Sequence, residues 1–300
     1  MFSDTHFHFE HLTQNPQVSG ADILSHMARR SCFFALDIGT RCDDLLSREA
    51  CVDRAISQIR DGVLADKARA FVYFSAGIWP DVEEINERSQ NMRLLCECID
   101  AAASSQDTDT LHRKIIAIGE CGLDHHWNPS GVDGRNADDF DEKTLLGETE
   151  LFEMQIDLAK RLSLPVIVHS RDAFDDTYNC IKNSGYARGI IHCFSYGIDE
   201  ARAFLDLGWH ISFAGGVTYT KKSKMDAMTE LLRFVPNDRI LCETDSPYLA
   251  PVPFRGMQNN PLLVEHTYNF IAKARGVSVE DLSNAVDKNI QSLFSNLLEE

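Results

Sequence analysis

The sequence lacks any long apolar stretch. It has 300 residues, 44% of them hydrophobic, but no uninterrupted run approaches the roughly 20 residues that a membrane-spanning helix needs. It opens on Asp4 and two histidines rather than on a basic stretch followed by an apolar segment, so we expect no secretory signal, no membrane partner and a cytoplasmic location. Positive charge is also scarce, because 29 Lys and Arg stand against 46 Asp and Glu, a net charge of −17. This balance argues against a non-specific binder of duplex nucleic acid, which must neutralise many phosphates.

Several motifs and segment types are missing as well. The nine cysteines include no Cys-x-x-Cys pair, which favours reduced thiols in a reducing compartment over a disulfide framework. No Gly-x-Gly-x-x-Gly motif follows the first predicted strand, so nothing supports dinucleotide binding. The chain has no linker rich in Pro, Gly or Ser, no internal repeat and no low-complexity tract. We therefore predict a single domain over residues 1–300.

Short apolar runs alternate with amphipathic segments of helical length, a pattern typical of βα units around a parallel sheet. Eight strands are predicted, over residues 2–8, 33–38, 71–78, 114–120, 165–169, 189–192, 209–213 and 239–245. Helices are predicted over residues 45–59, 85–103, 149–162, 173–183, 199–207 and 225–234, with closing helices over 261–275 and 279–298. Ser278 is the expected N-cap of the last helix, since Asp281 follows three residues later. Eight such units predict an α/β fold of the (β/α)8 TIM-barrel type, with a doubly wound sheet as the alternative.

The acidic side chains are unevenly distributed. Residues 1–150 contain 27 acidic and 14 basic side chains, a net charge of −13, whereas residues 151–300 contain 19 and 15, a net charge of −4. Residues 131–150 alone contain seven carboxylates, and such a like-charged stretch is typical of a solvated loop. By contrast, Lys221, Lys222 and Lys224 form a small basic cluster after the seventh predicted strand.

Metal-binding residue types recur at the ends of the predicted strands. His6 and His8 alternate at the end of the first strand, so their side chains point to one side. The fourth, fifth, sixth and eighth strands end on Glu120, His169, His192 and Asp245. A lone histidine is usually structural, and a lone acid after a strand often caps the next helix. Five strands that end in this way predict a metal site on the face where barrel active sites are built.

Five segments, taken together, resemble one protein family. They read Asp-Thr-His-Phe-His at 4–8, Gly-Glu-Cys-Gly-Leu-Asp at 119–124, Pro-Val-Ile-Val-His-Ser-Arg at 165–171, Ile-His-Cys-Phe-Ser at 191–195 and Glu-Thr-Asp-Ser-Pro-Tyr-Leu-Ala-Pro at 243–251. In this order they resemble the TatD family of metal-dependent hydrolases, within the amidohydrolase superfamily. Arg-Gly at 255–256 and Asn-Asn-Pro at 259–261 extend the resemblance, which runs from residue 3 to about residue 290.

The resemblance implies a metallo-dependent hydrolase barrel with two divalent ions. The implied ligands are His6, His8, Glu120, His169, His192 and Asp245. By motif, the first two histidines and Asp245 would bind one ion, the other two histidines would bind the second, and Glu120 would bridge both. Asp245 would also accept the proton of the metal-activated water, so Asp245 and Glu120 are the implied catalytic residues. Zn, Mn, Mg and Fe are all compatible with this ligand set.

The chain departs from the family after the third predicted strand. The family usually carries Gly-x-His-Pro there, whereas this sequence reads Gly-Ile-Trp-Pro at 77–80. Trp79 cannot bind a metal ion or transfer a proton, but it can stack on a base or cover the pocket.

Other charged residues near the motifs are candidates for contact with substrate. Arg171 and Arg255 are placed to bind a substrate phosphate, and each has a salt bridge as its alternative role. Lys221 and Lys222 complete the predicted substrate-binding set. Asp124 is expected to orient a metal-binding histidine.

Two enzymatic functions are compatible with the sequence, and a non-catalytic role is disfavoured. The resemblance implies a deoxyribonuclease that hydrolyses phosphodiester bonds of DNA, at ends or in single strands. The rival within enzymes is a two-metal hydrolase of small esters, lactones or amides, because one barrel supports many chemistries. A non-catalytic binding protein is expected to lack a metal ligand or Asp245, and neither is missing. No stable protein partner is implied, and a monomer is the default expectation.

Overall fold

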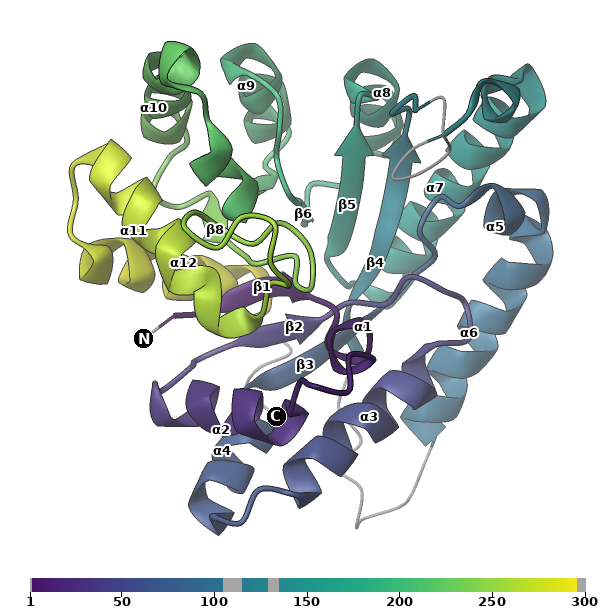
Figure 1. Ribbon diagram of the computed structural model, residues 1–300. Helices are drawn as coiled ribbons and strands as arrows, with labels where there is room; N and C mark the ends of the chain where they lie inside the picture. The colour runs from purple at the N-terminus through teal and green to yellow at the C-terminus, as the bar shows by residue number, and fades with distance from the viewer. Residues whose placement is uncertain (1, 105–114, 129–134, 296–300) are drawn as a thin grey trace.

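Parallel strands form the centre of the computed structural model, which describes residues 2–104, 115–128 and 135–295. The strands pair in sequence order in one sheet, and every pairing is parallel. They are β1 (Asp4–Phe7), β2 (Ala35–Asp37), β3 (Val72–Ala76), β4 (Ile115–Asp124), β5 (Val166–Arg171), β6 (Gly189–Ile191), β7 (His210–Phe213) and β8 (Ile240–Cys242). The sheet returns on itself, because Phe7 pairs with Ser246 just beyond β8 (Figure 1). The predicted (β/α)8 barrel is confirmed.

Helices alternate with the strands and surround the barrel (Figure 1). They are α1 (Phe9–Thr13), α2 (Gly20–Arg29), α3 (Leu45–Ser57), α4 (Gly62–Phe71), α5 (Val82–Asn86), α6 (Arg88–Ser104), α7 (Glu142–Leu162), α8 (Phe174–Ser184), α9 (Ile198–Asp206), α10 (Met225–Phe234), α11 (Val264–Arg275) and α12 (Val279–Leu293). The predicted helix over 85–103 is thus two helices, and α1, α2 and α4 lie outside the predicted set. Ser278 caps α12 as expected, since its hydroxyl accepts a hydrogen bond from Asp281 N at 3.0 Å. Residues 296–298 of the last predicted helix lie outside the described residues.

Apolar side chains occupy both faces of the sheet. In β5, for example, Val166, Ile167 and Val168 are all fully buried. Strands of a parallel sheet covered by helices are buried on both faces, which explains why they read as continuous apolar runs. None of the helices in the described part of the chain is long and apolar enough to cross a membrane. All nine cysteines are free thiols.

Some predicted strand ends are wrong. Glu120 and His169 lie inside β4 and β5 rather than at their ends, because these two strands keep pairing as far as Asp124 opposite Arg171. The register of the pair shifts around Glu120, and an irregularity of this kind re-aims a side chain. β8 is shorter than predicted, so Asp245 lies in the loop that follows it.

The acidic stretch predicted as a solvated loop is helical over much of its length. Residues 131–134 lie outside the described part of the chain, but α7 begins at Glu142. Asp141 caps this helix by accepting hydrogen bonds from Lys143 N at 2.8 Å and Thr144 N at 3.0 Å. Carboxylates at a helix N-terminus interact favourably with the helix dipole, so the excess of acid here favours a helix start.

His210 makes the stability of the fold pH-dependent. Its side chain is buried at the start of β7, and burial, with Arg239 adding to the effect, lowers its pKa from 6.5 to about 4. Between these values the unfolded chain binds more protons than the folded one, so stability that is fully present above pH 6.5 is lost as the pH falls towards 4. The loss expected from this shift is about 3 kcal/mol.

Denaturant unfolding of the wild type and of His210→Phe at pH 7.5 and pH 4 measures this contribution. We expect the wild type to lose about 3 kcal/mol more than the variant over this range. Comparing the two proteins cancels the titration of all other groups. A difference between them that does not change with pH would contradict the assignment to His210.

Candidate metal centre

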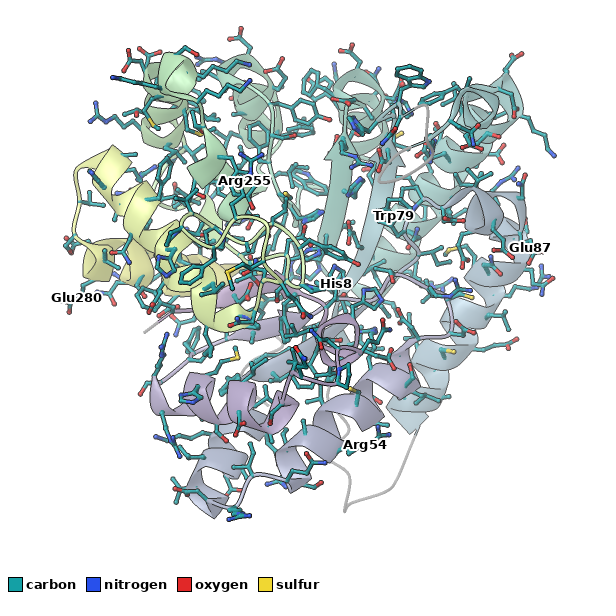
Figure 2. All side chains as sticks on the ribbon, in the orientation of Figure 1. His8, Arg54, Trp79, Glu87, Arg255 and Glu280 are labelled. Carbon is teal, nitrogen blue, oxygen red and sulfur yellow. The ribbon has the colours of Figure 1, made fainter. Side chains whose placement is uncertain are left out.

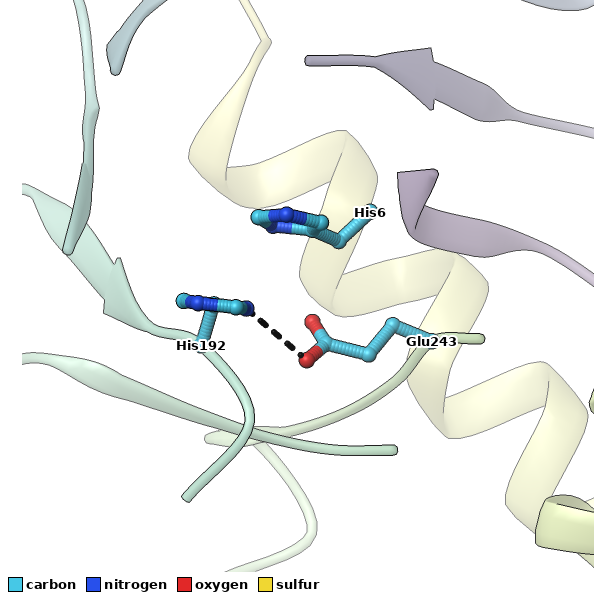
Figure 3. Close-up of side chains that lie close together, drawn as sticks. All are labelled: His6, His192 and Glu243. Atoms are coloured by element: carbon cyan, nitrogen blue, oxygen red, sulfur yellow. Dashed lines mark hydrogen bonds and ion pairs between the residues drawn. The ribbon is translucent and has the colours of Figure 1, made fainter. Parts of the chain in front are cut away.

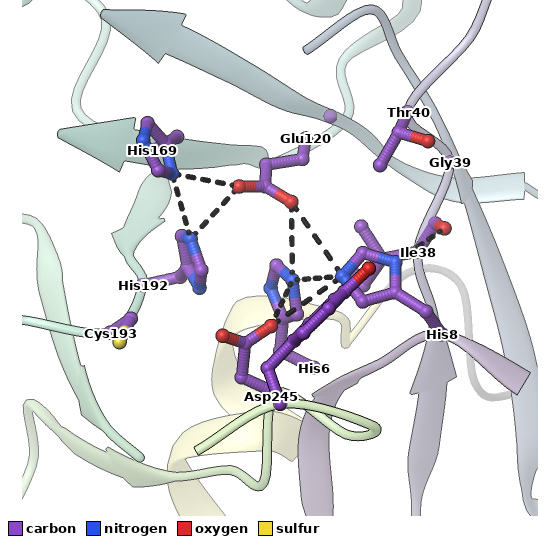
Figure 4. A network of polar contacts seen from close by, with 12 residues as sticks. His6, His8, Ile38, Gly39, Thr40, Glu120, His169, His192, Cys193 and Asp245 are labelled. Atoms are coloured by element: carbon purple, nitrogen blue, oxygen red, sulfur yellow. Dashed lines mark hydrogen bonds and ion pairs between the residues drawn. The ribbon is translucent and has the colours of Figure 1, made fainter. Parts of the chain in front are cut away.

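The six side chains predicted as metal ligands meet at the carboxyl-terminal end of the barrel (Figure 4). The Glu120 carboxylate lies at their centre. Its Oε1 is 2.9 Å from His169 Nδ1 and 3.0 Å from His192 Nε2. Its Oε2 is 3.3 Å from His6 Nε2 and 3.9 Å from His8 Nε2. Each carboxylate oxygen therefore faces one pair of histidines.

Asp245 completes the half of the centre that contains the first two histidines. Its Oδ1 is 3.7 Å from His6 Nε2 and 3.5 Å from His8 Nε2. Asp245 has a φ of 56°, a left-handed conformation that is uncommon for residues other than glycine. Its backbone N donates to His6 O at 2.8 Å, and this bond helps to hold the unusual conformation. Backbone strain of this kind is concentrated at functional sites.

The donor atoms fit a divalent cation. His6 Nε2 and His8 Nε2 are 3.3 Å apart, and His169 Nδ1 and His192 Nε2 are 3.4 Å apart. Each pair forms, together with Glu120, a group whose ligand atoms all lie within 4.8 Å of one another. Imidazole nitrogens and carboxylate oxygens are the ligands that Zn²⁺ and similar ions bind. The two groups share Glu120, which offers one oxygen to each.

Charges within the centre stabilise one another. Burial alone would raise the pKa of Glu120, but the imidazoles of His192, His169 and His6 hold it well below its ordinary value. Burial would likewise lower the pKa of His192, yet the Glu120 and Glu243 carboxylates raise it well above the ordinary value. The central carboxylate is therefore charged, and it is in the form that binds cations.

Glu243 fixes the orientation of His192 (Figure 3). It is fully buried, and its Oε1 lies 3.3 Å from His192 Nδ1. The same oxygen accepts from Cys193 N at 2.6 Å, and Oε2 accepts from the Ser212 hydroxyl at 2.6 Å. Glu243 also lies near enough to His6 and His192 to form a ligand group. Because protein donors already occupy both of its oxygens, we interpret it as an orienting residue.

Asp124 orients His169 in the same way that Glu243 orients His192. Its Oδ2 is 3.1 Å from His169 Nε2, the ring nitrogen that faces away from Glu120. Arg171 donates to both oxygens of Asp124, at 3.0 Å from Nε and 2.7 Å from the terminal nitrogen. The structure thus places Arg171 in the salt bridge that was its alternative role. A carboxylate that accepts from the second nitrogen of a ligand histidine fixes both the tautomer and the ring orientation.

Of the other predicted substrate-binding residues, Trp79 lies beside the centre, and Figure 2 labels it together with Arg255 and His8. The ring of Trp79 is 5.5 Å from that of His169, at an angle of 72°. The Arg255 guanidinium lies 4.4 Å over the ring of Tyr219. Lys221 and Lys222 are exposed in the segment after β7 and form no ion pair among the described residues.

Sequence reasoning missed a buried network beneath the centre. Arg48 on α3 is only 4% exposed and donates to a carboxylate oxygen of Asp37 and, at 2.7 Å, to Ser75 O. The Ser75 hydroxyl in turn donates to Gly119 O at 2.6 Å, immediately before Glu120. The sequence suggested a different role for Arg48. Asp44 stands four residues before it, which is the spacing of an ordinary ion pair on an exposed helix surface.

A second contact that sequence reasoning missed joins the first strand of the barrel to the segment after the last strand. Asp4 is buried in β1, and its Oδ2 accepts from the Thr244 hydroxyl at 2.6 Å. Its Oδ1 accepts from Thr244 N at 2.9 Å. Thr244 lies between Glu243 and Asp245, so this pair of bonds holds both carboxylates in register with the histidines of β1. The sequence offered Asp4 only as part of a motif and gave no indication of its partner.

Fold and site together define a class, the barrel hydrolases that depend on metal ions. The family model for TatD related DNase matches residues 3–295. The metal-dependent hydrolase YcfH of Escherichia coli (strain K12) is 31% identical, with 97% of this chain and 94% of the relative covered. The 3'-5' ssDNA/RNA exonuclease TatD of Pantoea vagans (strain C9-1) is 30% identical, with 77% and 81% covered. The solved structure of YJJV, a TatD homologue from Escherichia coli K12, has the same fold, with a TM-score of 0.74, 24% identity and 98% of each chain covered. The chain therefore belongs to the TatD family of metal-dependent hydrolases.

Replacing the carboxylate that orients His192 tests how far metal binding depends on its surroundings. Glu243→Gln keeps the volume of the side chain but removes the charge, and we expect it to weaken divalent-metal binding by about 10- to 100-fold. Titration of the chelator-treated protein with Zn²⁺ or Mn²⁺ measures the affinity. Glu150→Gln is the matched control, because Glu150 is half-exposed and pairs with Arg88 on the outer surface. Equal affinities for the two variants would contradict the orienting role.

Proposed function

We propose that the protein is a two-metal phosphodiesterase that cleaves DNA, at ends or in single strands. One observation carries the proposal: Glu120 presents one oxygen to each of two histidine pairs, as a carboxylate bridging two closely spaced cations would. The similarity to a relative named as a 3'-5' ssDNA/RNA exonuclease supports a nucleic-acid substrate.

The ligands divide into two sets around the bridge. His6, His8 and Asp245 would hold one ion, and His169 and His192 would hold the other. When bound, such ions lower the pKa of a water between them and stabilise charge on phosphoryl oxygens. The chain's own contribution is to hold the ligand atoms in place and to accept a proton.

Asp245 is the best candidate for that proton acceptor. Its side chain is 14% exposed, compared with 5% for Glu120, so it reaches the open side of the centre. Its Oδ1 lies within 4 Å of both histidines, and Oδ2 makes no ion pair with either of them. A carboxylate within reach of the attacking water contributes as a general base.

Cationic side chains in the segments after β7 and β8 would bind the phosphates of the substrate. Lys221 and Lys222 follow β7, and Arg255 follows β8. The two segments are joined, because Val252 N donates to the Thr218 hydroxyl at 2.9 Å. A net charge of −17 disfavours tight binding along a duplex, whereas a few local cations suit contact with a short strand end.

An activity screen by metal and substrate tests the proposal. The chelator-treated protein is supplied with Mg²⁺, Mn²⁺ or Zn²⁺ and offered labelled single-stranded DNA, blunt duplex DNA and a panel of esters, lactones and amides. We expect cleavage of single-stranded DNA that needs added metal and exceeds cleavage of the duplex. Ester, lactone or amide turnover without DNA cleavage under any metal would replace the nuclease proposal with the small-molecule alternative.

Asp245→Asn tests the proton acceptor. Loss of a general base is expected to lower kcat by about 10²- to 10⁴-fold. The unfolding temperature should stay close to that of the wild type, since asparagine has nearly the same shape. Asp226→Asn, an exposed acid on α10, is the control for loss of one carboxylate. Rates near the wild-type value in Asp245→Asn would remove its proton-accepting role.

A further inference from the structure

Trp79 forms an aromatic wall on one side of the metal centre. It follows β3, its ring meets His169 edge to face, and its side chain is partly exposed. In a barrel whose strands are ordered β1 to β8, β3 lies opposite β7. Lys221 and Lys222 follow β7. In the view of Figure 2, Trp79 and Arg255 lie apart from each other, to the right and to the left above His8. Cationic side chains thus follow β7 and β8, whereas the indole follows β3 and lies beside His169, whose other ring nitrogen meets the Asp124–Arg171 ion pair.

Buried hydrogen bonds fix the backbone that carries this indole. Trp79 N donates to Thr40 O at 2.9 Å. Gln155 on α7, which is fully buried, accepts from Ile78 N at 2.8 Å and donates to Ile78 O at 2.9 Å. Breaking such bonds leaves buried polar groups without partners, which is costly. These bonds fix the main chain from which the indole projects, and the ring itself packs against His169.

The following residue is fixed by a buried ion pair. Arg135 donates to Pro80 O at 2.8 Å and to the fully buried Glu148 carboxylate at 2.6 Å. Glu148 also accepts from Asp124 N at 2.8 Å. One ion pair therefore holds both the segment that carries Trp79 and the carboxylate that orients His169.

The segment also lies directly against the strand that carries Glu120. A Cβ atom at Gly77 would lie 2.4 Å from Gly119 Cα, so only glycine permits this close approach. Gly119 immediately precedes Glu120. This contact between two backbones fixes the segment before Trp79 relative to the strand that carries Glu120.

The indole can bind a substrate but cannot take part in proton transfer. Its Nε1 has no hydrogen-bond partner in the described part of the chain. The imidazole that its ring meets, His169, is already engaged, because it lies between Glu120 and Asp124. A rigid aromatic face beside a phosphate-binding centre is the kind of surface on which a nucleobase stacks, and such stacking tolerates any base.

We propose that Trp79 is a specificity-determining residue that stacks on the base of the nucleotide next to the scissile phosphate. This inference rests on the proposed function. It adds that the base of the nucleotide is recognised on the side of the metal centre that contains His169. The site then distinguishes a strand with an accessible base from the same backbone without one. Paired bases are stacked on their neighbours, so unpaired ends and single strands are the substrates that reach this wall.

Binding of two short oligonucleotides measures the effect. Fluorescein-labelled, hydrolysis-resistant phosphorothioate tetranucleotides, one of thymidine and one abasic, are titrated with the Mn²⁺-loaded protein and followed by anisotropy. We expect Trp79→Ala to weaken binding of the thymidine oligonucleotide by about 5- to 150-fold and to leave the abasic one nearly unchanged. Trp79→Phe should retain most of the preference. Trp127→Ala removes another exposed indole and should change neither.

Three results would overturn the inference. Equal losses of affinity for both oligonucleotides would show that the indole of Trp79 does not recognise a base. A loss of affinity in Trp127→Ala that is confined to the thymidine oligonucleotide would assign base recognition to Trp127 instead. If the wild type neither binds these oligonucleotides nor cleaves DNA, the proposed function fails together with the inference. If the wild type cleaves DNA but Trp79→Ala loses equal affinity for both oligonucleotides, only the role of Trp79 is overturned. Should Trp79→Ala unfold, Trp79→Leu fills the space without a planar face, and the same outcomes apply.

Discussion

The buried carboxylate of Glu120 is the constraint on which the rest of the site depends. It is 4% exposed, and among the described residues every ion-pair partner within 4 Å of it is a histidine. A buried carboxylate without compensating charge is very costly, so four imidazoles must be brought to it and held there. Two further carboxylates hold the imidazole rings in place. Asp124 contacts the second ring nitrogen of His169, and Glu243 contacts that of His192.

A further set of buried polar groups holds the backbone that carries these residues. Arg48 with Asp37 supports the strand before Glu120, and Arg135 with Glu148 supports the segments around Asp124. Buried ion pairs contribute little net stability, because desolvation offsets much of their attraction. Their effect here is geometric: each fixes main-chain atoms near the centre, so that the side chains above them meet at short distances.

The ligand residues could be predicted from the sequence because they depend on local rules. His6 and His8 alternate along one strand, and the others follow short apolar runs whose ends must meet in a parallel barrel. Even the errors were small, since Glu120 lies inside β4 and Asp245 lies beyond β8, yet both still point to the centre. An irregular register and a left-handed backbone aim them, and neither feature has a reliable signal in the sequence.

The supporting residues could not be predicted for a different reason. Arg48, Glu148 and Gln155 belong to helices, where charged and amide side chains usually face water. Glu148 stands in an acidic stretch, and Arg48 follows Asp44 at the spacing of a surface pair. Only the packing of α3 and α7 against the barrel turns these side chains inward, and that packing depends on contacts distant in sequence.

The same distinction explains how an acidic protein could accept the anionic substrate proposed for it. Asp4, Glu120 and Glu243 are buried and hydrogen-bonded or paired, so they contribute to the formal charge without forming an acidic surface. At ordinary ionic strength, exposed charges more than about 10 Å apart are largely screened from one another. The field that a substrate would meet is therefore set by the nearby groups, which are cationic after β7 and β8 and include the Asp124–Arg171 ion pair beside His169. On the proposed function, the cations would contact phosphates and the indole of Trp79 would contact a planar group.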